Sequence, residues 1–473
     1  MYKAYITRVT NIRPAANADR LNACEVFGNT TIIDKTITED TVVLYLPSDG
    51  QISVEFGEKN NLFRRKDDAG NNVGGFVDPV KRNITAIRLR GNRSDGLVLP
   101  ISCLNYCYAH GDASAELRVG DVIDGCVNGH EICQKYIPRR PDPSRAHGGN
   151  KTRKKKTPTA PLFAEHVDTE QLAYNLSAFK PGDEIEITLK MHGTSQRTGY
   201  LPVLKGYKRT FLDWLFRREG KPIYDWGYVS GTRRVVLENY EGGFYGDNQF
   251  REQHSKAFEG KLNKGETVYY EVVGFTTNGA PIMGDANNKK LNDKAFIKQY
   301  GETTRFSYGC SPTGIAVVQV PDTPYSIAVD GPQSDIYVYR MTMTNEDGFV
   351  VEYTPEFMRY RCEQMGVKCV PVFARMNLQE DGGFLFRKDG TYSAVAESDL
   401  GEFVMAAAEE FYDGPDPIGK THVREGVVVR ILNRPKFAAY KLKNFSFKCI
   451  EGLVKVEAEA PDFEEAQEVE NDT

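Results

Sequence analysis

The sequence has no long apolar run and no cysteine framework, and both absences narrow what the protein can be. No segment approaches the ~18 consecutive apolar residues of a membrane-spanning helix, and the first residues lack the basic-then-apolar layout of a secretory signal peptide. The nine cysteines are an odd number, scattered from Cys24 to Cys449, which argues against a disulfide framework. We therefore expect an intracellular, cytoplasmic protein with reduced thiols and no membrane contact.

The composition is that of an ordinary soluble protein. Hydrophobic residues make up 40% and charged residues 26% of the 473 residues, which excludes a wholly disordered chain, a collagen and a disulfide-rich miniprotein. At about 150 residues per domain the length suggests roughly three domains, with two or four as alternatives. Such a chain can bury a real core without covalent cross-links.

Two segments have a strongly biased charge. Residues 138–161 are rich in proline, glycine and small polar residues, and they hold eight lysines or arginines against one acid. We interpret them as a flexible linker that is solvated, grips a phosphate backbone or acts as a nuclear-import signal. From 451 to the end, nine acids face one lysine. This predicts a disordered acidic tail over 454–473, which keeps the protein soluble or competes with an anionic ligand.

The region before the linker favours short strands. Alternating or β-branched runs lie at 2–9, 22–27, 41–46, 84–90 and 97–99. Their spacing, with turn signals between them, suggests a small barrel or sandwich. Arginines near Phe76 form either a nucleic-acid groove or a solvated surface: Arg82, Arg88, Arg90 and Arg93. A zinc hypothesis rests on Cys103, Cys107, Cys126, Cys133 and His130, but the C-x3-C and C-x6-C spacings fit a zinc ribbon poorly.

The most informative segment is EIEITLKMHGTSQR at 184–197. Apolar Ile185, Ile187 and Leu189 alternate with polar residues, which predicts a strand with one apolar face. Lys190 therefore projects from the polar face at the end of the strand, followed by a turn of small, hydrogen-bonding residues. Taken alone, the segment more often describes a strand that ends in a solvated lysine.

Four later segments place charged or aromatic side chains in strands that are otherwise apolar. These side chains are Glu271 in YYEVVG, Tyr337 and Tyr339 in IYVYRM, Glu425 in REGVVVRI, and Lys441 and Lys443 in AYKLK. Buried charges need partners, because unpaired burial costs several kcal/mol. Each feature alone is more often a structural salt bridge. Together with Lys190, they suit a pocket for a nucleotide and its metal.

KMHGTS at 190–195 resembles motif I of the covalent nucleotidyltransferases, the superfamily of ATP-dependent DNA ligases, RNA ligases and mRNA capping enzymes. SGTRR at 230–234 is similar to motif Ia, YYEVVG to motif III, IYVYRM to motif IIIa, EGVVVR to motif IV and AYKLK to motif V, and their order matches the superfamily. The histidine of KxHG, where DNA ligases usually carry aspartate, resembles RNA ligases more.

The N-terminal region narrows the resemblance to one family. NADRLNACEV, LPSDGQIS and LRGNRSDGLVLP resemble the OB-type domain of the RNA ligase 5 family, the Deinococcus and Naegleria type; the ADRL and LRGNRSDG pieces are also similar to OB-fold tRNA-binding domains. EHVDTEQL at 165–172 resembles the start of that family's ligase module. Residues 205–226, which include Trp214, Arg217, Arg218 and Trp226, look additional to the family pattern.

The resemblance implies an α+β fold. An OB-type β-barrel domain for nucleic-acid binding would span 1–137, followed by the linker at 138–161. An ATP-grasp-like adenylyltransferase domain, with antiparallel sheets flanked by helices, would span 162–453. The acidic tail at 454–473 would complete the chain.

The resemblance also implies a three-step ligation. Lys190 would attack the α-phosphorus of ATP, giving lysyl-AMP; AMP would pass to a 5′-phosphate; and a 3′-OH would then seal the strand. A lysine nucleophile must be neutral although its reference pKa is about 10.4, and burial, nearby cations and a metal all favour the neutral form. The implied catalytic residues are Lys190, Glu271, Glu425, Lys441 and Lys443.

The implied nucleotide-binding residues are Lys190, His192, Gly193, Arg233, Glu271, Tyr339, Lys441 and Lys443. Tyr339 would stack on adenine, with Tyr337 as the alternative, and Arg233 would contact the ribose or phosphates, with Arg234 as its rival. Magnesium or manganese would be held by Glu425, with Glu271 on the ribose hydroxyls or a second metal. His192 either orients the loop or is a structural turn residue.

The implied substrate is RNA or a nicked RNA/DNA duplex whose 3′-OH strand ends in RNA. The implied process is RNA repair. We expect a monomer with no obligate protein partner. An ATP-dependent DNA ligase is an alternative, against which the KxHG histidine and the N-terminal OB domain argue. A capping guanylyltransferase would carry its OB domain after the catalytic domain. A nucleic-acid-binding protein that has lost catalysis is the non-enzyme alternative.

Overall fold

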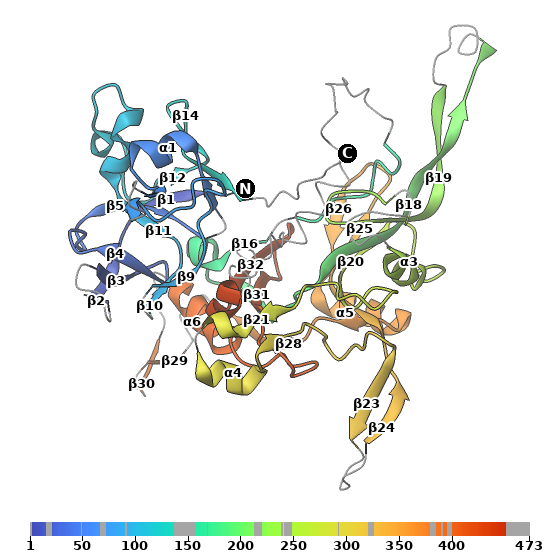
Figure 1. The fold of residues 1–473 in the computed structure, drawn as a ribbon. Helices are drawn as coiled ribbons and strands as arrows, with labels where there is room; N and C mark the ends of the chain where they lie inside the picture. Colours follow the sequence, from blue (N-terminus) through green and yellow to red (C-terminus); the bar gives the residue numbers. More distant parts are fainter. Residues whose placement is uncertain are drawn as a thin grey trace. The chain divides into compact units, whose positions relative to one another are not determined.

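The computed structural model describes residues 2–15, 21–48, 50–66, 72–89, 92–136, 158–167, 169–211, 220–237, 240, 248–291, 293–319, 326–378, 385–388, 391–394 and 400–450. The chain forms two compact units (Figure 1). The N-terminal unit comprises the described residues of 1–138, 290–292 and 448–459, and the C-terminal unit comprises those of 139–289 and 293–447. The basic part of the predicted linker and the predicted acidic tail lie outside the described residues.

The N-terminal unit is built mainly from short strands. They are β1 (Ala4–Arg8), β2 (Thr10–Pro14), β3 (Leu21–Val26), β4 (Asn29–Asp34), β5 (Val42–Leu46), β6 (Gly50–Ile52), β7 (Arg64–Lys66), β8 (Asn72–Gly74), β9 (Ile87–Leu89), β10 (Asn92–Ser94), β11 (Leu97–Pro100), β12 (Val122–Ile123), β13 (Cys126–Val127), β14 (His130–Glu131) and β15 (Cys133–Lys135). Helix α1 (Val54–Lys59) and the 3₁₀ helices η1 (Ile101–Cys107) and η2 (Ala113–Ala115) accompany them.

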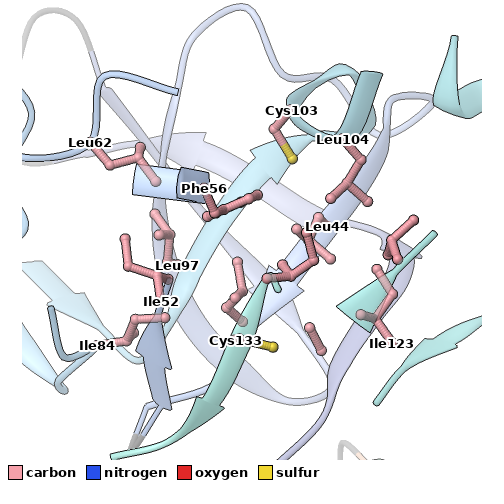
Figure 2. Close-up of a cluster of buried hydrophobic side chains, with 14 of the residues drawn as sticks. Leu44, Ile52, Phe56, Leu62, Ile84, Leu97, Cys103, Leu104, Ile123 and Cys133 are labelled. Carbon is pink, nitrogen blue, oxygen red and sulfur yellow. The ribbon is translucent and has the colours of Figure 1, made fainter. Parts of the chain in front are cut away.

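These strands form several antiparallel sheets around one core. The largest has the order β11-β5-β1-β12, and a second has the order β2-β3-β4. Among the described residues the strands do not close into a single barrel. Figure 2 shows the core, in which Leu44 and Phe56 meet side chains from several of these elements. Because β5 is almost wholly apolar, it is buried on both faces and takes a central position in its sheet.

The cysteines of this unit pack as apolar groups. Cys103 and Cys107 of η1 and Cys133 of β15 are buried in the core, and burial raises the pKa of Cys133 to about 12. The described residues contain no group of three or more His, Cys, Asp or Glu side chains that could hold a metal ion. These thiols contribute packing rather than ligands.

A segment from the far end of the sequence belongs to the N-terminal unit. Lys448 forms an ion pair with Asp95, whose backbone carbonyl accepts hydrogen bonds from the hydroxyls of Thr31 and Tyr45. Cys449 and Ile450 are almost fully buried. Although the sequence assigned 448–450 to the ligase domain, these residues complete the N-terminal unit.

The C-terminal unit contains the longer strands and most of the helices. Its strands are β16 (Glu170–Gln171), β17 (Glu184–Lys190), β18 (Thr194–Lys208), β19 (Lys221–Gly231), β20 (Glu266–Gly274), β21 (Ala286–Asn287), β22 (Thr303–Thr304), β23 (Ile315–Gln319), β24 (Ser326–Asp330), β25 (Ser334–Thr344), β26 (Val350–Glu352), β27 (Lys368–Cys369), β28 (Val372–Asn377), β29 (Leu385–Lys388), β30 (Thr391–Ala394), β31 (Gly426–Ile431) and β32 (Ala438–Lys443). Its helices are α3 (Gln249–Lys256), α4 (Lys294–Tyr300), α5 (Pro355–Met365) and α6 (Leu400–Tyr412), with 3₁₀ turns η4 (Leu172–Tyr174), η5 (Leu176–Ala178) and η6 (Asn288–Leu291), the last of which runs into segment 290–292.

Two sheets organise this unit. One has the order β16-β32-β31-β17-β28, and the other has the order β19-β18-β20-β25-β26, with β27 pairing parallel to β25. Apart from the β16–β32 and β25–β27 pairs, their strands run antiparallel. The prediction of an α+β fold with antiparallel sheets and helices is confirmed. None of the helices described is long and apolar enough to span a bilayer.

Local sequence signals explain where the elements begin and end. Helix α5 starts at Thr354, whose hydroxyl accepts a hydrogen bond from the Phe357 N–H, and Pro355 takes the first helical position. It ends at Gly366 with a left-handed φ of 69°. The C-terminal unit also starts earlier than expected, because Thr159 accepts a hydrogen bond from Leu204 N–H and Ala160 is buried.

Candidate active site

The register of three neighbouring strands places the predicted lysines on one face of a sheet. Lys190 of β17 lies opposite Gly426 of β31, which lies opposite Lys443 of β32. Two rows along, and so on the same face, Val428 lies opposite Lys441. Directly opposed residues of antiparallel strands project to the same side. The strand pairing therefore gathers three cations that are far apart in the sequence.

Gly426 permits this arrangement. A Cβ atom at this position would lie 2.0 Å from the backbone oxygen of Leu442, and its φ is +149°. Only glycine adopts such a conformation without strain. Because Gly426 places no side chain between them, Lys190 and Lys443 can approach a common partner.

That partner is Glu425. Its Oε1 lies 2.8 Å from Lys190 Nζ and 3.2 Å from Lys443 Nζ, and its side chain is only 2% exposed. Strict alternation along the strand would put Glu425 on the face of Val427 and Val429. The unusual φ of Gly426 interrupts the alternation, and Glu425 instead contacts the lysines.

The electrostatics of this cluster keep Glu425 ionised. Burial alone raises the pKa of a carboxyl group, but the attraction of Lys190 and Lys443 outweighs burial and holds the pKa of Glu425 well below its ordinary value. The carboxylate in turn stabilises the charged form of both amines. The cluster thus holds a carboxylate and two ammonium groups in a nearly dry environment.

The loop after Lys190 is fixed by backbone contacts and by rings. The N–H of His192 donates a 2.7 Å hydrogen bond to the hydroxyl of Tyr308, and the imidazole packs edgewise on Phe306 and Phe447. His192 Nδ1 lies 3.6 Å from Glu425 Oε2. These contacts support both the structural role of His192 and the one in which it orients the loop.

Gly193 lets the same loop approach the second sheet. A Cβ atom there would lie 2.4 Å from the Val272 carbonyl oxygen and 2.9 Å from Glu271 Cγ. Any larger residue would push the loop away from β20. Gly193 thus sets the distance between the Lys190 strand and the strand that carries Glu271.

A cavity lies against both sheets at this point. Predicted residues that line it are Lys190, Arg233, Glu271 and Tyr339, together with Ser195, His166, Glu186, Arg359, Arg430 and Phe437. Four of the lining side chains are cations and two are carboxylates. A cavity with aromatic walls and a surplus of cations can accept a flat ring joined to anionic groups.

The residues that the sequence left as alternatives differ in whether they line the cavity. Tyr339 lines the cavity, and its hydroxyl lies 2.9 Å from Ser195 Oγ. Tyr337 is not part of the lining, and its hydroxyl donates a 3.3 Å bond to Asp335. The pairing of β20 with β25 shifts between Tyr269 and Tyr270, so that Tyr339 lies at an irregularity of the strand. In the same way Arg233 lines the cavity and Arg234 does not.

His166 was missed in the sequence, although it lies within the EHVDTEQL segment. Its ring is 5.1 Å from that of Tyr339 and 5.6 Å from that of Phe437, and it lines the cavity. Burial and then the charges of Arg340, Arg233, Arg197 and Arg430 hold the pKa of His166 well below its ordinary value. Since arginine only donates, the 3.3 Å contact makes His166 Nδ1 the acceptor for Arg340 Nη1.

Arg251 of α3 was also missed. It is 1% exposed, and it donates hydrogen bonds to the Ser195 carbonyl and to Thr194 Oγ1, at 3.1 and 2.5 Å. Its own carbonyl accepts a bond from Gln196 Nε2 at 2.9 Å. Arg251 therefore holds the start of β18, and through Ser195 it supports Tyr339. A lone arginine in a polar helix gives no sequence signal for this role.

Glu271 and Glu425 could hold a metal ion only if a bound ligand supplied further oxygen atoms. Glu271 lines the cavity, and Glu425 Oε2 accepts no hydrogen bond from the part of the chain described here. Because no cluster of three metal-binding side chains occurs in the described residues, a divalent cation would need further oxygens, such as phosphates. Mg²⁺ is commonly held this way, by one or two carboxylates and a phosphate.

Other predicted residues lie apart or outside the description. Arg82 Nη1 donates to the Ile52 carbonyl within the N-terminal unit, and Phe76 is exposed. Arg90, Trp214, Arg217 and Arg218 lie outside the described residues, as do the side chains of Arg88 and Arg93.

Comparisons with known proteins show solved structures of similar fold but no match among family models or curated proteins. A solved structure of a Naegleria gruberi RNA ligase mutant with ATP and manganese is 17% identical, with a TM-score of 0.51, and the match covers 94% of this chain and 97% of that one. The same ligase with pyrophosphate is 16% identical, with a TM-score of 0.51, covering 97% and 99%. The resemblance predicted from the motifs is thus confirmed at the level of the fold.

Proposed function

We propose that this protein is an ATP-dependent RNA ligase of the RNA ligase 5 type. The observation that carries the proposal is the cluster of Lys190, Glu425 and Lys443 beside a cavity lined by Tyr339 and Arg233. The fold likeness over nearly the whole chain to an RNA ligase solved with ATP and manganese supports it. The cavity supplies a nucleophile, cations for phosphates and an aromatic shelf, which are the groups that nucleotidyl transfer needs.

In the first step, Lys190 Nζ forms a bond to the α-phosphorus of ATP, and the bond to pyrophosphate breaks. The amine must first lose a proton to water, yet its 2.8 Å contact with Glu425 favours the ammonium form. That contact therefore has to weaken as the nucleotide binds. Lys443, 3.2 Å from the same oxygen, remains to hold the carboxylate. The ion pair thus keeps Lys190 unreactive until ATP is present.

The other residues bind and orient the nucleotide. Tyr339 stacks on adenine, with His166 and Phe437 behind it. Arg233 contacts the ribose or phosphates, Glu271 holds the ribose hydroxyls, and Lys441 and Lys443 stabilise the departing pyrophosphate. A divalent metal bound by Glu425 or Glu271 and the phosphates would supply charge neutralisation at the phosphorus.

The second and third steps use the same cavity. The AMP moves from Lys190 to the 5′-phosphate of a strand, which restores the lysine. The 3′-OH of the adjoining strand then forms the phosphodiester bond and releases AMP. The N-terminal unit would act as an OB-type nucleic-acid-binding domain that holds the strand.

The experiment that tests this function is sealing of matched nicked duplexes that differ only in the sugar bearing the 3′-OH. We expect ATP-dependent sealing when the 3′-OH strand ends in RNA and little sealing when it ends in DNA. Equal sealing of both would favour a DNA ligase. No sealing and no AMP transfer to the 5′-phosphate would refute the proposal.

A further inference from the structure

Strands β18 and β19 form a two-stranded arm, which includes described parts of the segment that looked additional to the ligase family. Strands β18 and β19 pair along their length, from Arg197 opposite Gly231 to Lys208 opposite Lys221. The register shifts once, between Leu204 and Gly206. Figure 1 shows them as a long hairpin, drawn in green. The described residues of the arm beyond Tyr200 do not line the nucleotide cavity. The function proposed above leaves this arm without a role.

One face of the arm is aromatic. Tyr200 lies opposite Tyr228, and Pro202 lies opposite Trp226. The rings of Tyr200 and Tyr228 stack with centroids 4.7 Å apart, and Trp226 follows at 5.8 Å from Tyr200. By register, Tyr224 and Tyr207 continue the same face outward. Of these rings, Tyr207 is exposed and the other four are half-buried.

The opposite face already anchors the base of the arm. Leu201, Val203 and Val229 form a buried cluster with Phe163 and Ala160. The base is therefore held by ordinary apolar packing on one side. Tyr224 and Tyr228 also make structural hydrogen bonds, to Pro158 O and from Gly260 N–H, but Trp226 and Tyr207 extend the aromatic face.

Cations accompany the rings. Lys264 Nζ lies 5.2 Å above the ring of Trp226. In the described parts of the outer arm, 204–211 and 220–226, four cations stand against one acid, Asp225. Two of them, Lys208 and Lys221, are exposed and directly opposite each other, on the face of the arm away from the rings. The exposed Lys264 is therefore the cation that lies on the aromatic face itself.

We propose that the β18–β19 arm binds single-stranded nucleic acid, with bases on the aromatic face and a phosphate on Lys264, beside Trp226. Stacked rings beside cations are the chemistry by which proteins hold single strands without reading sequence. The substrate class rests on the ligase function proposed above. The arm would grip a strand at a distance from the reacting ends and add affinity without touching the nucleotide.

Fluorescence anisotropy of the full chain with a labelled single-stranded oligoribonucleotide, without ATP, tests this proposal. Trp226→Ala should weaken binding about tenfold, since a base–aromatic stack contributes on the order of 1–3 kcal/mol, while Trp226→Phe should retain most of the affinity. Lys264→Ala should lower the slope of log affinity against log salt by about 0.7, for the one phosphate that is no longer neutralised.

The matched control is Lys294→Ala with Lys298→Ala, which removes two exposed lysines from helix α4. It should leave affinity and salt slope as in the native chain. Native affinity in both arm variants, or an equal loss in the control, would overturn the proposal. So would a dimer, seen by light scattering, that the arm variants abolish while oligonucleotide binding stays unchanged.

The test separates this inference from the ligase function. Lysyl-AMP formation with ATP shows that each variant is folded, because the substituted residues lie away from the cavity. Lysyl-AMP formation together with native binding in the arm variants would refute only the role of the arm. If the native chain forms no lysyl-AMP and the arm variants still lose oligonucleotide binding, only the ligase function is refuted.

Discussion

Replacing Glu425 by glutamine should destabilise the C-terminal unit more than any exposed carboxylate could. The substitution keeps the size of the side chain and removes its charge. Lys190 and Lys443, which both contact Glu425 Oε1 at 2.8 and 3.2 Å, would then face each other without a counter-charge. Their side chains are 15% and 9% exposed, so water can solvate them only in part.

The expected magnitude follows from this burial. Removing one partner of a buried ion pair costs about 3–5 kcal/mol. Because two lysines lose the same partner but keep some access to water, we expect a loss of about 3 kcal/mol in the free energy of unfolding at pH 7. Urea unfolding followed by tryptophan fluorescence measures it. Trp226 of β19 belongs to the C-terminal unit, so its fluorescence reports on that unit.

The effect has a defined pH dependence. The pKa of Glu425 is held well below its ordinary value by the two lysines, against the opposing effect of burial. The carboxylate therefore contributes its full stability above the unfolded pKa of about 4.3. That contribution is lost as the pH falls towards the folded pKa. The difference between the native chain and Glu425→Gln should thus be constant from pH 8 to about 5 and shrink in stronger acid.

Two further variants sharpen the test. Glu302→Gln makes the same change in an exposed pair, where Glu302 lies 2.6 Å from Lys289 with 66% of its side chain exposed, and it should cost about 0–1 kcal/mol. Adding Lys443→Met to Glu425→Gln should restore part of the stability, because one uncompensated cation is removed. A loss no larger than that of Glu302→Gln, or a difference that grows in acid, would refute the reasoning.

Three other variants test neighbouring parts of the account. Tyr339→Ala should raise the ATP concentration for half-maximal lysyl-AMP formation about tenfold through loss of stacking, whereas Tyr339→Phe and Tyr337→Phe should change it little; equal effects in all three would contradict the assignment. When the pH falls below about 6.5, the His166→Gln variant should lose less stability than the native chain. The pKa of His166 is depressed in the folded protein, so acid protonates this side chain mainly in the unfolded state and favours unfolding. Parallel pH profiles of the two proteins would contradict this reasoning. Cys449, buried in the N-terminal unit, should react with a thiol reagent in a chain that lacks 1–137 but not in the full chain, with Cys449→Ser identifying the signal; no reaction in the shortened chain would show that another part of the protein covers it.

Strand periodicity predicted the positions of the three lysines best. The alternation in 184–190 put Lys190 on a polar face, and AYKLK put Lys441 and Lys443 together on one face; the register of β17, β31 and β32 places all three on one side of a sheet. Such predictions work because side chains alternate strictly along a strand. They fail where one residue leaves the strand conformation, as Gly426 does beside Glu425.

Contacts between distant segments were beyond the sequence. His166 and Arg251 belong to stretches without a strong pattern, and their importance comes from the arginines and the strand start that they meet in three dimensions. The same holds for Lys448, whose partner Asp95 lies more than 350 residues away in the chain. No local propensity encodes such pairings, because they depend on how complete elements pack.

The extra segment at 205–226 shows a different limit. Its composition marked it as unusual for the family, but period two was obscured by the irregularity between Leu204 and Gly206. Only the register shows that Tyr200, Trp226 and Tyr228 share a face. A one-residue shift in pairing would send every one of these side chains to the other side.

The most direct test of the central claim is the intact mass of the protein after incubation with ATP and magnesium. The preparation is first treated with pyrophosphate, which removes any AMP already attached, and the native chain is compared with Lys190→Ala. The account predicts a gain of one AMP in the native chain and none in the variant. No gain in the native chain, or an equal gain in Lys190→Ala, would contradict the assignment of Lys190 as the nucleophile of an ATP-dependent ligase.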